Sequence, residues 1–426
     1  MNSLIAQTVV LFTRFKVLSI MKISDIAKEL GVSQKRAEKL LASELQLSDE
    51  QSGKLSTDGV SISRLRNSLL RSKKSESELV KQSKSVSTAR ETEWIDISDK
   101  WTSPQNHKFT CADLFCGAGG MALGFEMAGF KTVAGTDWYE PAKNTYEENF
   151  TAPFIYGDIR EEGSKQEFVQ KIQKQTNSLT VLSGGFPCQG FSMAGNRVVT
   201  DPRNSLYKEM LEIVDRLSPE FVVMENVKGL RSMLKGRVER QIIIDLQNLG
   251  YDVQVETLVA SNYEVPQKRE RVIFIGRKKG RPIFHPAPLL SEAEWITSGE
   301  AIGDLMNAPE NSLHNHVFTR HRADMVERIK LVPEGSSLYK NYSDSWKRIE
   351  WNKASCTIKE NHGGVNIHPK LNRVMTPREL ARLQSFPDHF KFSGSKNKQL
   401  VQIGNAVPPL LAKAIGLAII QALESK

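Results

Sequence analysis

The feature that most constrains this chain is the ten-residue stretch Ser183–Ser192, which reads SGGFPCQGFS. It follows the apolar run Leu179–Leu182, which is typical of a buried strand, and the pair Gly184-Gly185 predicts that the strand ends there. Cys188 is thereby placed on a turn at the carboxyl end of a strand, where open α/β sheets bind their ligands. A thiol beside backbone amides loses its proton more readily than one in a core, which favours a nucleophile. The alternative is that Cys188 is a small buried hydrophobe.

Four further motifs accompany this stretch in a fixed order: DLFCGAGG at Asp113–Gly120, ENV at Glu225–Val227, QKRER at Gln267–Arg271 and QIGNAV at Gln402–Val407. Together the five motifs resemble the DNA cytosine-5 methyltransferases that use S-adenosylmethionine, of the bacterial restriction-modification type. The resemblance extends from about Phe109 to the C-terminus. It implies an enzyme that methylates C5 of cytosine at specific sites in double-stranded DNA and thereby protects host DNA.

The resemblance also implies an α/β fold: a Rossmann-like S-adenosylmethionine methyltransferase sheet, a smaller irregular target-recognition domain and a small helical N-terminal unit. We expect a catalytic domain at 108–284, completed by 400–426, and a target-recognition domain at 285–399. Before them we expect an N-terminal extension at 1–20, a helix-turn-helix-like unit at 21–50 and a basic flexible linker at 51–107.

The N-terminal quarter supports two interpretations. Ile26, Ala27 and Leu30 recur at helical spacing, Gly31 interrupts them, and a second helical face follows, so the unit could contact DNA or serve as scaffolding. Ser61–Arg90 holds eight Lys or Arg against two Glu and so supplies most of the net charge of +9. The remaining chain is close to neutral, and charge argues only weakly for a nucleic-acid groove there. Met21 is an alternative translation start.

The predicted cofactor site begins with a glycine-rich turn after the strand Phe109–Leu114, because glycines let a nucleotide-like ligand approach the backbone. The next strand ends at Asp137-Trp138, an acid that can accept both ribose hydroxyls and an aromatic face for the adenine. Many relatives carry Glu at the first of these positions. By resemblance, Asp158 contacts the adenine amino group. The full set of expected S-adenosylmethionine contacts is Phe115, Gly117, Gly119, Gly120, Asp137, Trp138, Asp158, Ile159, Pro187 and Asn405.

The predicted catalytic residues are Cys188, Glu225, Arg269 and Arg271. Cys188 and Glu225 are 37 residues apart, enough for one crossover, which places them at the ends of neighbouring strands. By resemblance, Cys188 attacks C6 of a flipped-out cytosine while Glu225 donates a proton to N3. Alternation puts Arg269 and Arg271 on one side, within reach of the cytosine O2 and a phosphate. The alternatives are a helix-capping Glu225 and a solvated edge strand.

The expected DNA contacts are Gln189 and Arg203 in the loop after Cys188, Gln267, and Arg320 and Arg322 in the recognition region. The stretch Arg373–Asp388 matches the ninth motif of the family, which we expect to hold the recognition region in shape. Two competing functions stay open. One is RNA cytosine-5 methylation by the same chemistry, and the other is a DNA-binding regulator that acts through the N-terminal helices.

The four cysteines form no CxxC pair and have no metal-ligand spacing with histidine, so we expect neither a disulfide framework nor a metal site. The apolar run Val9–Phe12 is followed by Arg14 and Lys16, the wrong charge order for a secretory signal. We therefore expect a cytoplasmic monomer with no membrane association. The family type leaves open a cognate restriction endonuclease encoded alongside, without direct contact.

Overall fold

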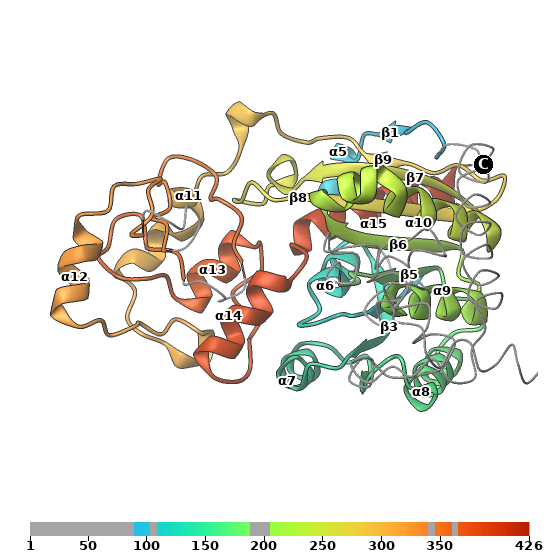
Figure 1. Ribbon diagram of the computed structural model, residues 1–426, viewed down its shortest axis with the longest axis horizontal. Helices are drawn as coiled ribbons and strands as arrows, with labels where there is room; N and C mark the ends of the chain where they lie inside the picture. Colours follow the sequence, from blue (N-terminus) through green and yellow to red (C-terminus); the bar gives the residue numbers. More distant parts are fainter. Residues whose placement is uncertain (1–88, 103–108, 188–204, 340–345, 360–364, 426) are drawn as a thin grey trace, which may run out of the picture. The chain divides into compact units, whose positions relative to one another are not determined.

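The computed structural model describes residues 89–102, 109–187, 205–339, 346–359 and 365–425 (Figure 1). The chain divides into two units, Met1–Ser87 and Thr88–Lys426, and the structure described below belongs to the second. The predicted N-terminal extension, the helix-turn-helix-like unit and most of the predicted linker lie outside the described residues. So do three predicted site residues, Cys188, Gln189 and Arg203.

The centre of the second unit is a seven-stranded sheet with the order β4-β3-β2-β5-β6-β8-β7. The strands from β4 to β6 in that order are parallel, and β8 runs antiparallel to both of its neighbours. Their bounds are β2 Phe109–Leu114, β3 Phe130–Asp137, β4 Phe154–Tyr156, β5 Val181–Gly184, β6 Phe221–Val227, β7 Tyr251–Val259 and β8 Glu270–Lys278.

Helices cover both faces of this sheet, which confirms the predicted α/β fold (Figure 1). Alternate residues of β6 belong to different cores: Val222 and Met224 pack with α8, α9 and α10, whereas Phe221 and Val223 pack with α6 and α15. The helices are α6 Gly120–Met127, α7 Glu140–Asn149, α8 Glu162–Gln173, α9 Ser205–Leu217, α10 Arg237–Asn248 and α15 Pro409–Glu424, with the 3-10 turns η5 Lys228–Gly236 and η6 Ala260–Tyr263.

The predicted recognition region is irregular within its described residues, as expected from its loose periodicity. It contains the short elements η7 Glu292–Glu294, α11 Ser298–Ile302, η8 Gly303–Asn307, η9 Ser312–His314 and α12 Ala323–Lys330. Helices α13 Pro377–Leu383 and α14 Lys396–Asn405 follow, and their apolar side chains share a core with α6 and α7. The ninth motif thus connects the recognition region to the helices beside the glycine-rich turn.

Residues 89–102 form a strap across the catalytic unit, although the sequence assigned them to a flexible linker. Strand β1 (Trp94–Ile95) pairs with β9 (His285–Pro286), and α5 (Ser98–Trp101) buries its Trp101 beside α15. The Arg90 amide donates to the Val253 carbonyl at 2.9 Å. The predicted linker therefore ends before Ala89 rather than at residue 107, and 285–286 pack with the catalytic unit rather than with the recognition region.

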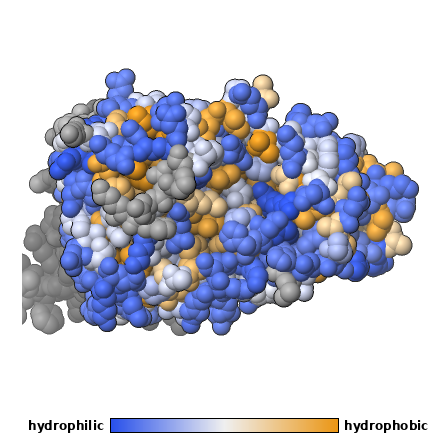
Figure 2. All heavy atoms as spheres, turned by 180° about the vertical axis from the view of Figure 1, so that it is seen from behind, coloured by the Kyte–Doolittle hydropathy of each residue, from blue (hydrophilic) through white to orange (hydrophobic). Residues whose placement is uncertain are grey.

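Helix α15 accounts for the one segment of the described chain that is long and apolar enough to cross a membrane, Lys396–Glu424, which also takes in α14. The most apolar window of this segment is 78% buried inside the protein, as is typical of a core helix. Figure 2 shows polar side chains over much of one face, with hydrophobic areas interspersed among them. The burial of this window is consistent with α15 being an internal packing element.

Candidate active site

The carboxyl ends of the five parallel strands carry most of the predicted site residues that the structure describes. Strands β2, β3, β4, β5 and β6 end at Leu114, Asp137, Tyr156, Gly184 and Val227. Because parallel strands end at one edge of a sheet, the glycine-rich turn, Asp137, Asp158, Pro187 and Glu225 are brought to the same edge. The strand order therefore brings together site residues that the sequence analysis predicted in separate motifs.

The glycine-rich turn depends on its glycines for packing as well as for access. Gly119 has a φ of 91°, and a Cβ on it would lie 2.4 Å from the Phe150 ring. A Cβ on Gly120 would lie 2.3 Å from the Val407 carbonyl oxygen. Gly117, in contrast, has no described residue within 4 Å of its Cβ position. Helix α6 thus packs tightly against the C-terminal segment, whereas the described residues leave space beside Gly117.

Asp137 organises this turn. Its Oδ2 accepts a hydrogen bond from the Gly117 amide at 2.8 Å, and its Oδ1 accepts one from the Tyr139 amide, also at 2.8 Å. Burial raises the pKa of this carboxyl group, and the backbone donors oppose that shift. Each carboxylate oxygen retains a second lone pair that can accept from a ribose hydroxyl. The adjacent Trp138 is 70% exposed, so an aromatic face is available beside the acid.

The remaining predicted cofactor residues differ in accessibility. Asp158 forms a bidentate ion pair with Arg160, whose side-chain hydrogen bond lowers the pKa of the Asp158 carboxyl. Ile159 is buried in the core beneath α8 rather than open to a ligand. Pro187 and Asn405 are exposed, at the end of the β5 turn and at the last residue of α14.

Two of the predicted catalytic residues, Glu225 and Arg271, form an ion pair. The Arg271 Nε lies 2.7 Å from Glu225 Oε1, and the two side chains are only 12% and 13% exposed. A Cβ built at Gly185 would lie 3.0 Å from Glu225 Oε2. Glu225 is therefore fixed by an arginine on one side and lies against the turn that leads to Cys188 on the other.

Two residues for which the sequence suggested no role also shape this edge. Asn226 is buried, and its Nδ2 donates to the Phe186 carbonyl at 2.8 Å, two residues before Cys188. Asp113 is buried and accepts a hydrogen bond from the Ser183 hydroxyl at 2.8 Å. Burial raises the pKa of the Asp113 carboxyl to about 7. Both residues lie inside motifs quoted above, but only the pairing of β5 with its neighbours reveals their partners.

Gln267 and Arg269, for which the sequence predicted contacts to DNA and to the target base, are both buried. Gln267 is fully buried and binds the Leu383 carbonyl, Gln384 and the Ile358 amide. Arg269 is 2% exposed and donates to three backbone carbonyls. Both residues precede the regular strand, because β8 begins only at Glu270. In this structure neither side chain is open to DNA.

The two predicted recognition arginines are open to solvent. Arg320 is 76% exposed and pairs with Glu310 at 2.5 Å, and Arg322 is 89% exposed and pairs with Asp324 at 3.2 Å. Exposed pairs of this kind contribute little to stability and exchange partners readily.

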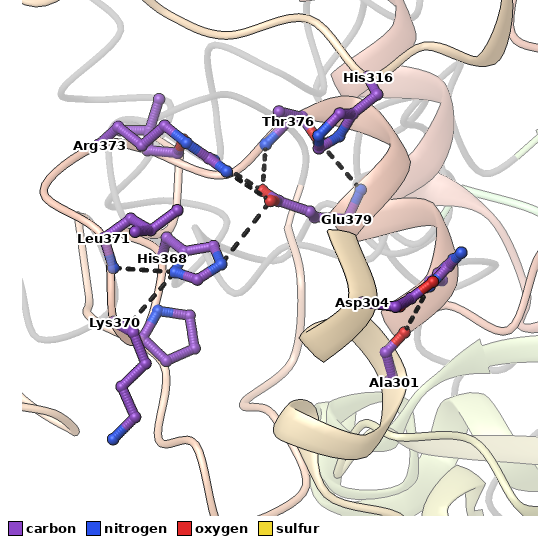
Figure 3. Close-up of polar contacts among 12 residues, drawn as sticks. Ala301, Asp304, His316, His368, Lys370, Leu371, Arg373, Thr376 and Glu379 are labelled. Atoms are coloured by element: carbon purple, nitrogen blue, oxygen red, sulfur yellow. Dashed lines mark hydrogen bonds and ion pairs between the residues drawn. The ribbon is translucent and has the colours of Figure 1, made fainter. Parts of the chain in front are cut away.

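The ninth motif is organised around the buried carboxylate of Glu379 (Figure 3). The carboxylate accepts two hydrogen bonds from Arg373, at 2.7 and 2.9 Å, and one from the Thr376 amide at 2.8 Å. His368 Nε2 lies 3.7 Å from the same carboxylate. Burial opposes ionisation of Glu379, but Arg373 outweighs it and lowers the pKa. The network connects His368 of the recognition region with the start of α13.

No group of three or more His, Cys, Asp or Glu that could hold a metal ion occurs among the residues that the structure describes. The described part of the site holds a glycine-rich turn, an acid and an exposed aromatic ring beside it, and a carboxylate paired with arginine. This combination on an open, mostly parallel sheet is typical of Rossmann-like enzymes that bind a nucleotide-type ligand.

Comparison with known proteins identifies the family. The profile of the C-5 cytosine-specific DNA methylases matches residues 109–421. The chain is 40% identical over 327 residues to the Type II methyltransferase M1.HphI of Haemophilus parahaemolyticus, covering 73% of this chain and 87% of the relative. It is 36% identical over 363 residues to M.DdeI of Desulfomicrobium norvegicum, covering 71% and 86%.

Among solved structures, a prophage-encoded DNA modification methyltransferase from E. coli aligns with a TM-score of 0.62 and 26% identity, covering 75% of this chain and all of the other. The chain therefore belongs to the C-5 cytosine-specific DNA methylase family and is a DNA cytosine-5 methyltransferase. The family uses S-adenosylmethionine as its methyl donor.

Proposed function

We propose that this enzyme methylates C5 of a cytosine flipped out of duplex DNA, through a covalent bond between Cys188 Sγ and cytosine C6. The observation that carries the proposal is the Glu225–Arg271 ion pair of 2.7 Å at the end of β6. Glu225 lies against Gly185, three residues before Cys188, so that a proton donor for the base and the nucleophile belong to one turn.

Each residue in this proposal answers a chemical requirement. C5 of cytosine is not nucleophilic, so the Cys188 thiolate adds to C6 while Glu225 gives a proton to N3, which turns the ring into an enamine. Arg271 holds the Glu225 carboxyl group and donates toward the cytosine O2. S-adenosylmethionine supplies the electrophilic methyl group that C5 accepts. Loss of the C5 proton and departure of Cys188 then restore the aromatic ring.

The residues at the edge of the sheet fit S-adenosylmethionine. Asp137 would accept hydrogen bonds from the ribose hydroxyls, and Trp138 would stack on the adenine. Asp158 would accept a hydrogen bond from the adenine amino group after its ion pair with Arg160 has broken. The support is the space that the described residues leave beside Gly117 and the 70% exposure of Trp138 directly after the acid. Phe115, the glycines, Ile159, Pro187 and Asn405 would complete the pocket. We assign no metal to this chemistry.

DNA recognition is proposed for Gln189 and Arg203 after Cys188 and for Arg320 and Arg322 in the recognition region. Neutralisation of phosphates by such arginines positions a protein on DNA, and contacts to base edges specify the site. Because the relatives are Type II methyltransferases, we propose a role in restriction-modification, with a cognate endonuclease encoded nearby. We further propose that the enzyme acts as a cytoplasmic monomer, since one chain carries every motif.

The test is bisulfite sequencing of DNA from cells that express the protein. We expect conversion-resistant cytosine at one short sequence, absent with Cys188→Ser. A duplex with 5-fluorocytosine at that site should trap an adduct on Cys188, since fluorine does not leave as the proton does; an adduct on Cys116 or Cys356 would contradict the assignment. Methyl incorporation into tRNA but not duplex DNA would favour an RNA methyltransferase instead.

A further inference from the structure

Arg269 of the motif QKRER contacts both the motif QIGNAV and the recognition region. Its Nη1 donates to the Ile358 carbonyl at 2.9 Å, in the recognition region. Its Nη2 donates to the Gly404 and Ala406 carbonyls, both at 3.1 Å. Those two carbonyls flank Asn405, a predicted cofactor contact at the end of α14. One guanidinium thus spans the recognition region and the cofactor turn.

The backbone at Arg269 is fixed as firmly as the side chain. The Arg269 carbonyl accepts from the Ala260 amide at 2.8 Å, and the Lys268 amide donates to the Ser355 carbonyl, also at 2.8 Å. Gln267 forms an isolated bridge with Ser355. The segment 355–358 therefore runs beside 266–269, and Arg271, which pairs with Glu225, follows two residues later.

Gln267 makes a second connection between the same elements. Its Oε1 accepts from the Ile358 amide at 2.9 Å, and its Nε2 donates to Gln384 Oε1 at 2.9 Å. Gln384 in turn donates to the Ile403 carbonyl at 2.7 Å. The buried side chains of Gln267 and Arg269 therefore both join Ile358 to residues 403–406. Arg269 does so directly, and Gln267 does so through Gln384.

Because the Arg269 guanidinium is buried, its free energy depends on the positions of its hydrogen-bond acceptors. Burial and repulsion from Arg271 lower the pKa of the Arg269 guanidinium, and the charge of Glu225 opposes this shift. Burying a guanidinium costs free energy unless its donors are satisfied. Here Nη1 and Nη2 donate to carbonyls at fixed positions, and Nε has no hydrogen-bond partner among the described residues. The rigid fork of arginine matches such a set, whereas the single ammonium of lysine does not. Displacing any of the three acceptors therefore disturbs the others.

We propose that Arg269 is a positioning residue that holds the Asn405 turn and the recognition segment at Ile358 in a fixed relation to the strand bearing Arg271. The cofactor site and the recognition region then depend on one buried anchor. This inference rests on the proposed function, because it assigns S-adenosylmethionine to the Asn405 turn. It replaces a direct contact of Arg269 with cytosine or phosphate.

Arg348 offers a matched control. It is likewise buried and its guanidinium donates mainly to backbone carbonyls, but every acceptor lies in residues 329–372 of the recognition region, namely Ile329, Val332, His368, Pro369, Leu371 and the side chain of Asn372. Arg348→Met, like Arg269→Met, removes a buried guanidinium and its hydrogen bonds to backbone carbonyls. None of the carbonyls that Arg348 binds lies in Gly404–Ala406. The two arginines therefore separate a general loss of stability from a specific effect on the cofactor site.

The experiment measures S-adenosylmethionine affinity by calorimetry without DNA, and DNA affinity on a labelled duplex, for Arg269→Met, Arg269→Lys and Arg348→Met, with melting curves to establish the folded fraction. We expect Arg269→Met to weaken both affinities by about tenfold or more, since one charged hydrogen bond corresponds to roughly that factor. Arg348→Met should weaken DNA binding only. If Arg269→Met does not fold, Arg269→Lys should show the same double loss to a smaller degree.

Unchanged S-adenosylmethionine affinity in folded Arg269→Lys and Arg269→Met overturns the proposal. An equal loss of S-adenosylmethionine affinity in Arg348→Met also overturns it, because the effect would then be general. The measurements do not depend on turnover. A wild-type protein that binds S-adenosylmethionine but methylates neither duplex DNA nor RNA would contradict the proposed function and not the role of Arg269.

Discussion

The ammonium group of Lys413 lies 4.2 Å from the centroid of the Trp101 ring, so that α15 holds the end of the strap 89–102 against the catalytic unit. The Trp101 indole donates to Glu264 at 2.8 Å, and Ile97 and Trp101 are both buried. A cation over an aromatic ring contributes about 1 kcal/mol, and burying each apolar side chain contributes about 2 kcal/mol. The strap is therefore part of the catalytic fold.

Two truncations test this conclusion. A protein that begins at residue 89 should melt close to the full-length temperature, whereas one that begins at residue 103 should lose on the order of 4 kcal/mol of unfolding free energy, because Ile97 and Trp101 leave the core. Urea denaturation measures the difference. Equal stability of the two proteins would show that the strap does not contribute. The first truncation also removes much of the basic segment, so its DNA affinity should depend less on salt while the methylated site stays the same.

Replacing the carboxylate of Glu225 should abolish most of the chemistry without unfolding the protein. Glu225→Gln keeps the shape and a hydrogen-bonding group, but it no longer offers a carboxyl proton to N3. We expect kcat to fall by about 10²- to 10⁴-fold, with S-adenosylmethionine affinity close to wild type. Single-turnover methyl transfer measures the effect.

The opposite end of the same strand supplies the control for that variant. Glu220 precedes β6 and pairs with Arg277 at 3.0 Å. Glu220→Gln should lower stability slightly and leave kcat within about twofold, since general acid catalysis requires a group at the reacting base. Comparable loss of kcat in both variants would mean that Glu225 acts through the sheet and not on the base.

Asn226 should control how fast the nucleophile reacts. Asn226→Leu fills a similar volume but leaves the Phe186 carbonyl without its donor, which costs about 1–3 kcal/mol when the group is buried. We expect adduct formation with 5-fluorocytosine DNA to slow by about tenfold, because the turn before Cys188 loosens. Asn149→Leu is the control, since the Asn149 side chain likewise donates to backbone carbonyls, those of Thr145 and Lys391, but from the last residue of α7. Similar slowing in both variants would argue for a general structural effect.

The sequence analysis located those site residues whose positions follow from the pattern of neighbouring residues. Apolar runs that end in glycine or an acid located Asp137 and Glu225 at strand ends, and parallel order brought them together. Arg269 could not be placed this way, because its acceptors at Ile358, Gly404 and Ala406 lie 89 to 137 residues further along the chain. The strap was missed for the same reason: its few apolar residues stand in a polar segment and find their partners more than 160 residues away.

His368 gives the recognition region a pH dependence that follows from burial. Its Nδ1 accepts from the Lys370 and Leu371 amides, at 3.1 and 3.0 Å. Burial lowers the pKa of His368 to about 4; Glu379 opposes this shift, whereas Arg373, Arg348 and His316 add to it. The folded protein therefore keeps this ring neutral under conditions in which the unfolded chain protonates it.

The sign of the effect follows from proton binding. Between the ordinary histidine pKa of about 6.5 and the folded value of about 4, the unfolded state binds a proton that the folded state does not. Unfolding free energy should therefore be unaffected by His368 above pH 6.5 and should fall as the pH drops below it, by about 2 kcal/mol at pH 5. His368→Asn retains an acceptor for the two amides but has no proton to gain. Urea unfolding at pH 7, 6 and 5 should show that the variant loses about 2 kcal/mol less than wild type over this range. Parallel curves for the two proteins would mean that His368 is protonated as readily in the folded state as in the unfolded chain.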